Sequence, residues 1–334
     1  SIPRSGAVSV TRFSSRLDAG VRATDGDLLF QTGFAVENAA TGAAVRFGHG
    51  EGALAFSQGA AFGLASDHRP STGGVNPVLG FASGGAYASG ETALSERLAL
   101  AVVMTAKHDG HRAANPITGE SNALFETLDA YSAGALAAEL RGRVSNQLHL
   151  TAGYTRLDED DALLGAQGLG DFAFADAVTD ALTIGAQAQL PYAVSLAGSA
   201  TLSRTRASGR TRSAVELSEA IASTAFQISL RREGVLGDAD AVRVSLIQPL
   251  HAERGAIDYT ARVVTDRATG AMGTVTRRWA LAGERDLAAE LLYAAPMLNG
   301  RAGLSLYTRV EAPEARFAGS SAEFTGGWRV DLDF

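Results

Sequence analysis

Hydrophobic and polar positions alternate with a period of two along most of this chain. The C-terminal segment 324–334 is the clearest case, with Trp328, Val330, Leu332 and Phe334 on one face and charged residues between them. Successive side chains of a β-strand point to opposite faces, so this alternation predicts a strand that is apolar on one face only.

The same alternation predicts a series of strands upstream. The predicted strands cover 97–107, 131–142, 145–156, 181–190, 193–205, 220–232, 241–250, 256–266, 273–282, 285–294 and 301–310. Pairs of turn-forming residues such as Arg254-Gly255 separate neighbouring strands. Many of these strands exceed the ~5–6 residues typical of soluble sheets and match the ~9–11 residues of a tilted membrane-spanning strand.

The first hundred residues carry a weaker pattern. We expect residues 1–26 to be a linker or N-terminal segment, and residues 27–334 to form one β-domain. Within that domain, 27–36 and 43–49 resemble a hairpin, and 53–60 is a candidate third strand. The Gly-, Ser- and Ala-rich segment 61–90 and the segment 108–130 are predicted as long loops.

Composition narrows the class of protein. The chain is 46% hydrophobic, yet its longest apolar run, near 98–106, is far shorter than the roughly 20 residues of a spanning helix, which excludes a helical membrane protein. The lack of cysteine excludes a disulfide scaffold and a thiolate zinc site, and the net charge of −7 argues against nucleic-acid binding. Residues 1–4 contain no initiator Met and no apolar signal core, so we expect a piece of a longer precursor.

Two all-β architectures fit the alternation. In a soluble β-sandwich or solenoid the apolar face turns inward. In a transmembrane antiparallel up-and-down β-barrel, of about twelve strands within a range of roughly 12–16, the apolar face meets lipid and the polar face lines a lumen. The length of the half-polar strands, the charges of both signs on the polar face and the aromatic residues near strand ends favour the barrel.

Charged residues on the polar face are the candidate functional residues. A charge on the lipid face near the bilayer midplane costs about 2–4 kcal/mol, so we expect these side chains to face the lumen. The lumen-facing candidates are Glu139, Arg141, Arg143, Arg243, Asp258, Arg262, Asp286, Glu290, Arg301, Arg309, Arg329 and Asp331. They either line a pore or pair with one another to satisfy the interior of a small barrel, and the sequence leaves both readings open.

Four stretches of the chain carry a family resemblance. They are Val242 to Gly255, Thr276 to Pro296, Asn76 to Ala82, and Leu163 to Phe172. The sequence over about 27–334 resembles the C-terminal region of autotransporter-type subtilisin-like serine proteases of alphaproteobacteria. The resemblance implies a translocator barrel of about twelve strands in the bacterial outer membrane, with a passenger domain N-terminal to it. It also implies that terminal aromatics, Phe334 and with it Trp328, act as a signal for the barrel-assembly machinery.

Candidate chemistry is sparse. The local His and Ser motifs of a subtilisin-like catalytic domain are missing, and Gly48-His49-Gly50 is only a glycine-flanked histidine. The pair His108 and His111 lacks a third metal ligand, and the run 158–161 (Asp-Glu-Asp-Asp) is either a calcium-binding loop or a solvated hairpin tip, the second reading being preferred. We therefore predict no enzyme activity in this chain, and no catalytic, cofactor or metal site.

Three functions remain open at this point. The first is a translocator that anchors or exports an N-terminal passenger. The second is a small outer-membrane channel or structural barrel without a passenger, and the third is an outer-membrane barrel enzyme. The expected partners are outer-membrane lipids and lipopolysaccharide, the barrel-assembly machinery and a possible passenger domain in the same precursor, with no nucleic acid.

Overall fold

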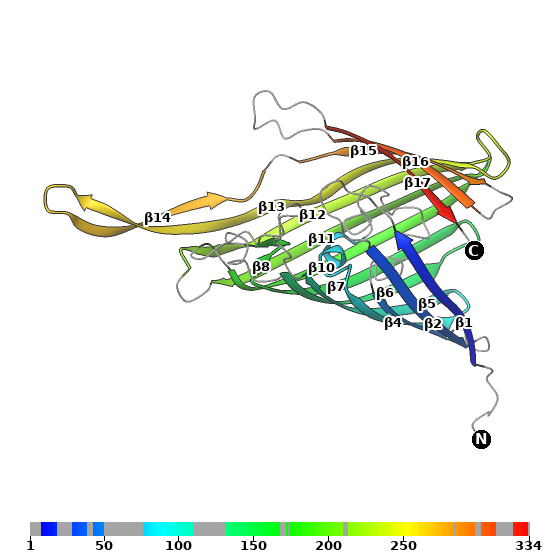
Figure 1. Ribbon diagram of the computed structural model, residues 1–334, viewed down its shortest axis with the longest axis horizontal. Coiled ribbons are helices and arrows are strands. Elements are labelled where there is room, and N and C mark those ends of the chain that lie inside the picture. Colours follow the sequence, from blue (N-terminus) through cyan, green and yellow to red (C-terminus); the bar gives the residue numbers. More distant parts are fainter. Residues whose placement is uncertain are drawn as a thin grey trace, which may run out of the picture.

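The chain is all-β, and its described residues form antiparallel strands in one large sheet, with one short helix (Figure 1). The computed structural model describes residues 8–18, 29–38, 43–49, 76–109, 131–167, 172, 174–209, 213–283, 285–297, 302–311 and 323–332. Its large sheet has fifteen strands, and a separate small hairpin has two.

The strands of the large sheet follow the chain in order. They are β1 (Val8–Asp18), β2 (Leu29–Asn38), β3 (Ala43–His49), β4 (Ala86–Ser95), β5 (Leu98–Asp109), β6 (Tyr131–Arg143), β7 (Leu148–Asp160), β10 (Phe174–Leu190), β11 (Val194–Gly209), β12 (Val215–Glu233), β13 (Ala241–Asp266), β14 (Ala271–Ala280), β15 (Ala288–Met297), β16 (Ala302–Glu311) and β17 (Glu323–Leu332). Each strand pairs antiparallel with the next, except that β14 lies off the path and pairs with β13 alone. β1 and β17 stand at the two ends of this order.

Short and long connections alternate along most of the sheet; the exception is the five-residue connection between β11 and β12. The short ones at 96–97, 144–147, 191–193 and 234–240 join β4–β5, β6–β7, β10–β11 and β12–β13. The connections that follow β3, β5, β7 and β16 are longer. Because neighbouring strands are antiparallel, all short turns listed here lie at one end of the strands, and the long connections lie at the other.

The strands agree closely with the predicted ones from residue 97 onward. One difference concerns Arg254-Gly255, where we expected a turn between two strands. β13 instead runs through this position as one long strand, and its pairing with β12 shifts register nearby, between Glu219 and Ala222. Gly255 has a φ of +143°, so a bulge-like kink replaces the turn.

Three elements lie where we expected a loop or linker. β4 and the helix α3 (Pro77–Phe81) both begin inside the predicted loop 61–90. β4 was missed because alanine, glycine and threonine occupy much of its exposed face, which gives no apolar period. β1 lies inside segment 1–26, and its register shifts between Val10 and Arg12, which interrupts the alternation. The candidate strand 53–60 lies outside the described residues.

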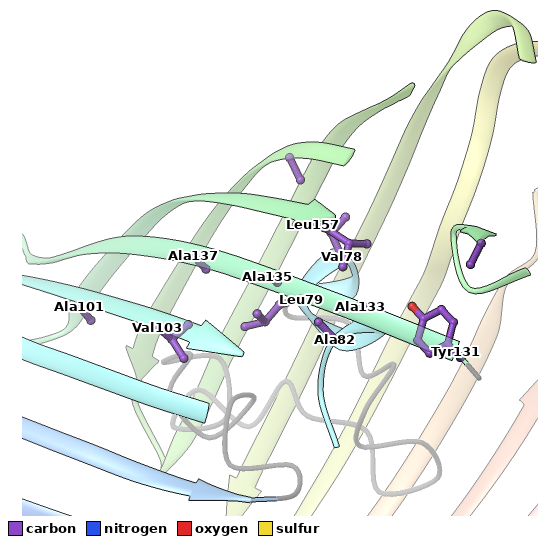
Figure 2. Packing of buried hydrophobic residues seen from close by; sticks show 12 residues of the cluster. Val78, Leu79, Ala82, Ala101, Val103, Tyr131, Ala133, Ala135, Ala137 and Leu157 are labelled. Carbon is purple, nitrogen blue, oxygen red and sulfur yellow. The ribbon is translucent and has the colours of Figure 1, made fainter. Parts of the chain in front are cut away.

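The helix α3 lies against the buried side of the sheet. Asn76 caps its first turn by accepting the backbone N–H of Leu79 at 3.1 Å, and Pro77 occupies the first turn, where no N–H is needed. Val78 and Leu79 are fully buried against an apolar patch of the sheet that includes Val103 (Figure 2). The helix contacts β6, β7 and also β13, so the sheet curves around it.

The end of β13 and the strand β14 form a hairpin that projects beyond the other strands (Figure 1). β12 accompanies β13 as far as Tyr259, opposite Val215. From that point to the turn 267–270, β13 pairs with β14 alone. Beyond Tyr259 the hairpin is therefore a two-stranded extension of the sheet with its own exposed surface.

Candidate functional site

The two faces of the sheet have opposite chemistry. On β10, Leu182 and Ile184 are more than half exposed, at 53% and 56%, whereas Thr179, Ala181 and Thr183 are buried. The same contrast recurs on the neighbouring strands. Further exposed apolar residues are Val102, Met104, Leu136, Leu140, Leu150, Leu196, Leu202, Ile228, Leu230, Val244, Leu246 and Leu291. The apolar face is thus the exposed one, which reverses the usual arrangement in soluble proteins.

The buried face carries small and hydroxyl-bearing side chains that bond across strands. Thr179 and Thr205 face each other with their Oγ1 atoms 2.8 Å apart, and Thr183 and Thr201 repeat this at 2.9 Å. Such cross-strand pairs stabilise the ladder. Further buried polar residues on these strands include Ser199, Ser203, Ser223, Gln227, Ser229 and Ser245.

One cluster of charges joins β13, β15 and β16. Glu290 accepts a hydrogen bond from an Arg243 Nη atom at 2.8 Å, and Arg309 Nη1 lies 3.9 Å from its other carboxylate oxygen. All three side chains are buried. Arg309 also donates to Glu311 Oε1 at 2.7 Å. Arginine and glutamate side chains alternate in this cluster, so each buried charged group has a neighbour of opposite charge.

A second cluster joins β3, β4 and β6 across the intervening β5. Arg141 donates to Glu139 at 2.8 Å and reaches Glu91 at 3.0 Å, and Arg46 approaches the same Glu91 oxygen at 3.3 Å. Ala101 on β5 is paired with Glu91 on one side and Glu139 on the other. Because its side chain is a single methyl group, the arginine can pass over β5.

The structure places the other lumen-facing candidates differently. Asp258 is half-buried and accepts hydrogen bonds from Ser218 and Arg278, both at 2.9 Å, while Arg143, Arg262 and Asp286 are exposed. Arg143 lies at the end of its strand, Arg262 on the projecting hairpin, and Asp286 before the first residue of β15. The alternation holds at the neighbouring buried residues Arg141 and Glu290, whereas the three exposed positions lie at a strand end, on the projecting hairpin and outside a strand.

The remaining candidates belong to the C-terminal strands. Trp328 is 72% exposed on β17, opposite Leu306. Arg301 and Phe334 lie outside the described residues, and so do the side chains of Arg329 and Asp331, whose backbone belongs to β17.

Glu159 forms a buried polar junction that the sequence did not reveal. Its carboxylate accepts the backbone N–H groups of Leu164 at 2.9 Å and Gly165 at 2.7 Å, and Tyr131 Oη lies 3.0 Å from it. Tyr131 Oη also lies 3.2 Å from the carbonyl oxygen of Phe81 in α3. The expectation of a solvated tip at 158–161 is therefore wrong for Glu159, which is buried because it holds the chain that leaves β7 against the helix.

The helix and this junction lie near the end of the strands that carries the long connections. Asn76 Nδ2 donates to Thr155 Oγ1 at 2.8 Å, and Thr105 Oγ1 donates to the carbonyl oxygen of Ala82 at 2.7 Å. The small hairpin of β8 (Ala162–Leu163) and β9 (Ala166–Gln167) follows directly after Asp161. The interior of the curved sheet thus holds α3 at that end. The sequence Asn76-Pro77 was the available signal, since it combines a helix cap with a first-turn proline.

The described residues contain no cluster of three or more His, Cys, Asp or Glu side chains arranged to hold a metal ion. None of the helices among the described residues is long and apolar enough to span a membrane. No protein-family model matches the chain, and no curated protein matches it.

Proposed function

We propose that the curved sheet is an outer-membrane β-barrel of the translocator type, which anchors or exports an N-terminal passenger. The observation that carries the proposal is the reversal of the two faces, with leucine and isoleucine exposed and threonine, serine and paired charges buried. An exposed apolar face of this extent is costly in water. In a bilayer the same side chains contact lipid acyl chains, and that cost does not arise.

Two further features support a barrel. The short connections at 96–97, 144–147, 191–193 and 234–240 all lie at one end of the strands, as do the tight turns of outer-membrane barrels. Without β14 the path holds fourteen strands, and an even number leaves β1 and β17 antiparallel, as closure requires.

The helix α3 inside one end of the curved sheet favours a translocator over an open channel. α3 packs against β6, β7 and β13 and is fixed by Asn76, Thr105 and Tyr131. A channel for small solutes needs a continuous aqueous path, and this segment narrows it. A translocator, in contrast, needs the interior to hold or pass a polypeptide only during export.

Display of a reporter at the cell surface tests this function. The chain is expressed in Gram-negative cells behind a signal peptide and a small reporter domain, and external protease then measures the exposed reporter. We expect the reporter to be cleaved at the surface of intact cells. The Phe334→Asp variant, which removes the proposed assembly signal, is expected to lower the amount of assembled chain.

The outcomes separate the alternatives. A chain that assembles in the outer membrane while its reporter stays inside would contradict the translocator. Steady ion conductance of the purified chain in planar bilayers would then favour the small-channel alternative. A chain that stays soluble without detergent would contradict both.

A further inference from the structure

The strand β14 presents an open sheet edge. It pairs with β13 on one side, and in the described part of the chain no other strand lies beside it. All of its residues are exposed except Gly273, which is half-buried. An exposed edge strand of ten residues offers a row of backbone N–H and C=O groups to another chain.

The hairpin is also amphipathic. Its register pairs Ile257 with Trp279 and Ala261 with Val275 on one face, and Thr260 with Thr276 on the other. The rings of Tyr259 and Trp279 stack with centroids 5.4 Å apart, and Phe172 stacks on Tyr259 at 5.6 Å. These stacked rings cover the apolar face only at the base of the hairpin, and Val275, closer to the tip, is 39% exposed.

The charge of the hairpin is opposite to that of the whole chain. Arg262, Arg267 and Arg277 are exposed, and among the described residues they have no ion-pair partner, whereas Arg278 pairs with Asp258. The carboxylate of Asp266 is hydrogen-bonded within the tip of the hairpin. It accepts the backbone N–H of Ala268 at 2.8 Å and the hydroxyl of Thr269 at 2.6 Å. The hairpin is therefore locally cationic in a chain of net charge −7.

We propose that the outer edge of β14 binds an extended acidic segment of another protein by strand addition. Main-chain hydrogen bonds to the open edge supply the affinity, and alternate side chains supply the specificity. Arg277 shares a face with Val275 and Trp279. The bound segment therefore places a carboxylate beside Arg277 and apolar side chains beside its two neighbours. The proposal does not depend on whether the sheet spans a membrane.

A synthetic peptide tests the proposal. The probe has about ten residues, to match the length of β14. One face of the peptide carries a central glutamate with valine two positions before and after it, and threonine fills the other face; the control peptide carries lysine in place of the glutamate. Both are titrated against the folded full chain in detergent. We expect saturable binding of the glutamate peptide, little binding of the lysine peptide, and slower backbone amide exchange across 271–280 when the glutamate peptide is bound.

Charge reversal separates the site from general electrostatics. Arg277→Glu is expected to weaken binding of the glutamate peptide by about tenfold or more. Arg97→Glu, in the β4–β5 turn at the opposite end of the strands, changes the net charge equally and is expected to leave binding unchanged. Both variants are first compared with the parent chain for their amide exchange in 131–143, which reports on folding of the sheet.

Three results would overturn the proposal. The first is equal affinity of the parent chain and Arg277→Glu for the glutamate peptide. The second is amide protection that excludes 271–280. The third is a chain that dimerises through the hairpin, becomes monomeric in Arg277→Glu and binds no peptide, because the occupant of the edge would then be a second copy.

Discussion

At the scale of single residues, the buried face depends on charges that satisfy one another. Glu290 is the carboxylate between Arg243 and Arg309, and all three side chains are buried. Each of these charges would be costly without its neighbour, because a buried ion that loses its partner keeps its full desolvation penalty. The ion pairs therefore explain how a face with so many charges stays folded.

Removal of Glu290 should destabilise the sheet strongly. In Glu290→Ala, two buried guanidinium groups lose their shared carboxylate, and we expect a loss of about 3 kcal/mol or more in the free energy of unfolding. Urea titration of the chain in detergent measures it. The matched control is Glu311→Ala, which removes a more exposed carboxylate from the same Arg309 and should cost about 1 kcal/mol or less. Equal losses in the two variants would contradict the role given to Glu290.

Asp240 organises the β12–β13 turn, and its effect should depend on pH. Its carboxylate accepts backbone N–H groups of Val235, Leu236 and Gly237 at 2.7, 2.8 and 3.0 Å, and the Tyr293 hydroxyl at 3.1 Å. Desolvation alone would raise the pKa of Asp240, but these hydrogen bonds outweigh it and hold the pKa below the ordinary value of 3.8.

The sign of the pH effect follows from the lowered pKa. Stability from this carboxylate is fully present above the ordinary pKa of 3.8 and is lost as the pH falls through the lower value of the folded state. We expect the amides of Val235 and Leu236 to lose protection in that acid range, after correction for intrinsic exchange rates. Asp240→Asn should show weaker protection that no longer changes there. Unchanged protection in the parent chain down to full protonation would count against this role.

At the scale of elements, β13 shows where local sequence signals mislead. Arg254-Gly255 has turn chemistry, yet the strand continues through it, because β12 lies alongside on both sides of the kink. A Cβ at Gly255 would lie 3.1 Å from Cγ1 and 3.2 Å from Cα of Ile221. The glycine is needed for close strand approach and a positive φ, and neither requirement is visible without the partner strand.

Substitution at Gly255 should therefore cost stability in a way that an ordinary strand glycine does not. Gly255→Ala is expected to lower the free energy of unfolding by about 1–3 kcal/mol, because the left-handed φ and the contact with Ile221 both oppose a methyl group. Gly90→Ala is the control, since a Cβ there meets no atom within 4 Å. The same urea titration compares them, and a neutral Gly255→Ala would refute the packing argument.

The strands could be predicted from sequence wherever the exposed face is rich in leucine, isoleucine and valine. From β5 onward this period identifies most strands, and it also assigned Glu139, Arg141, Arg243, Glu290 and Arg309 to the polar face that the structure buries. The period fails for β4, whose outer face is small and polar. It cannot find Glu159 or α3, because their positions depend on contacts between distant segments, such as Tyr131 with Phe81.

At the scale of the whole molecule, the central claim is that the exposed apolar face meets lipid. The chain's two tryptophans are suited to a direct test. Trp328 lies on β17 opposite Leu306, near the middle of its strand, whereas Trp279 lies at the base of the hairpin, where β12 ends. Each can be isolated by replacing the other with phenylalanine.

The decisive measurement is quenching of tryptophan fluorescence in phospholipid vesicles whose acyl chains carry bromine near their ends. In Trp279→Phe, the remaining Trp328 should be strongly quenched, since it is 72% exposed on the apolar face that the proposed barrel turns toward the hydrocarbon core. In Trp328→Phe, the remaining Trp279 should be quenched less, since it lies at the base of the hairpin, at the end of the paired strands, and one face of its ring is covered by Tyr259. Strong quenching of Trp279 without quenching of Trp328, or a chain that stays in solution beside the vesicles, would contradict the membrane-spanning barrel.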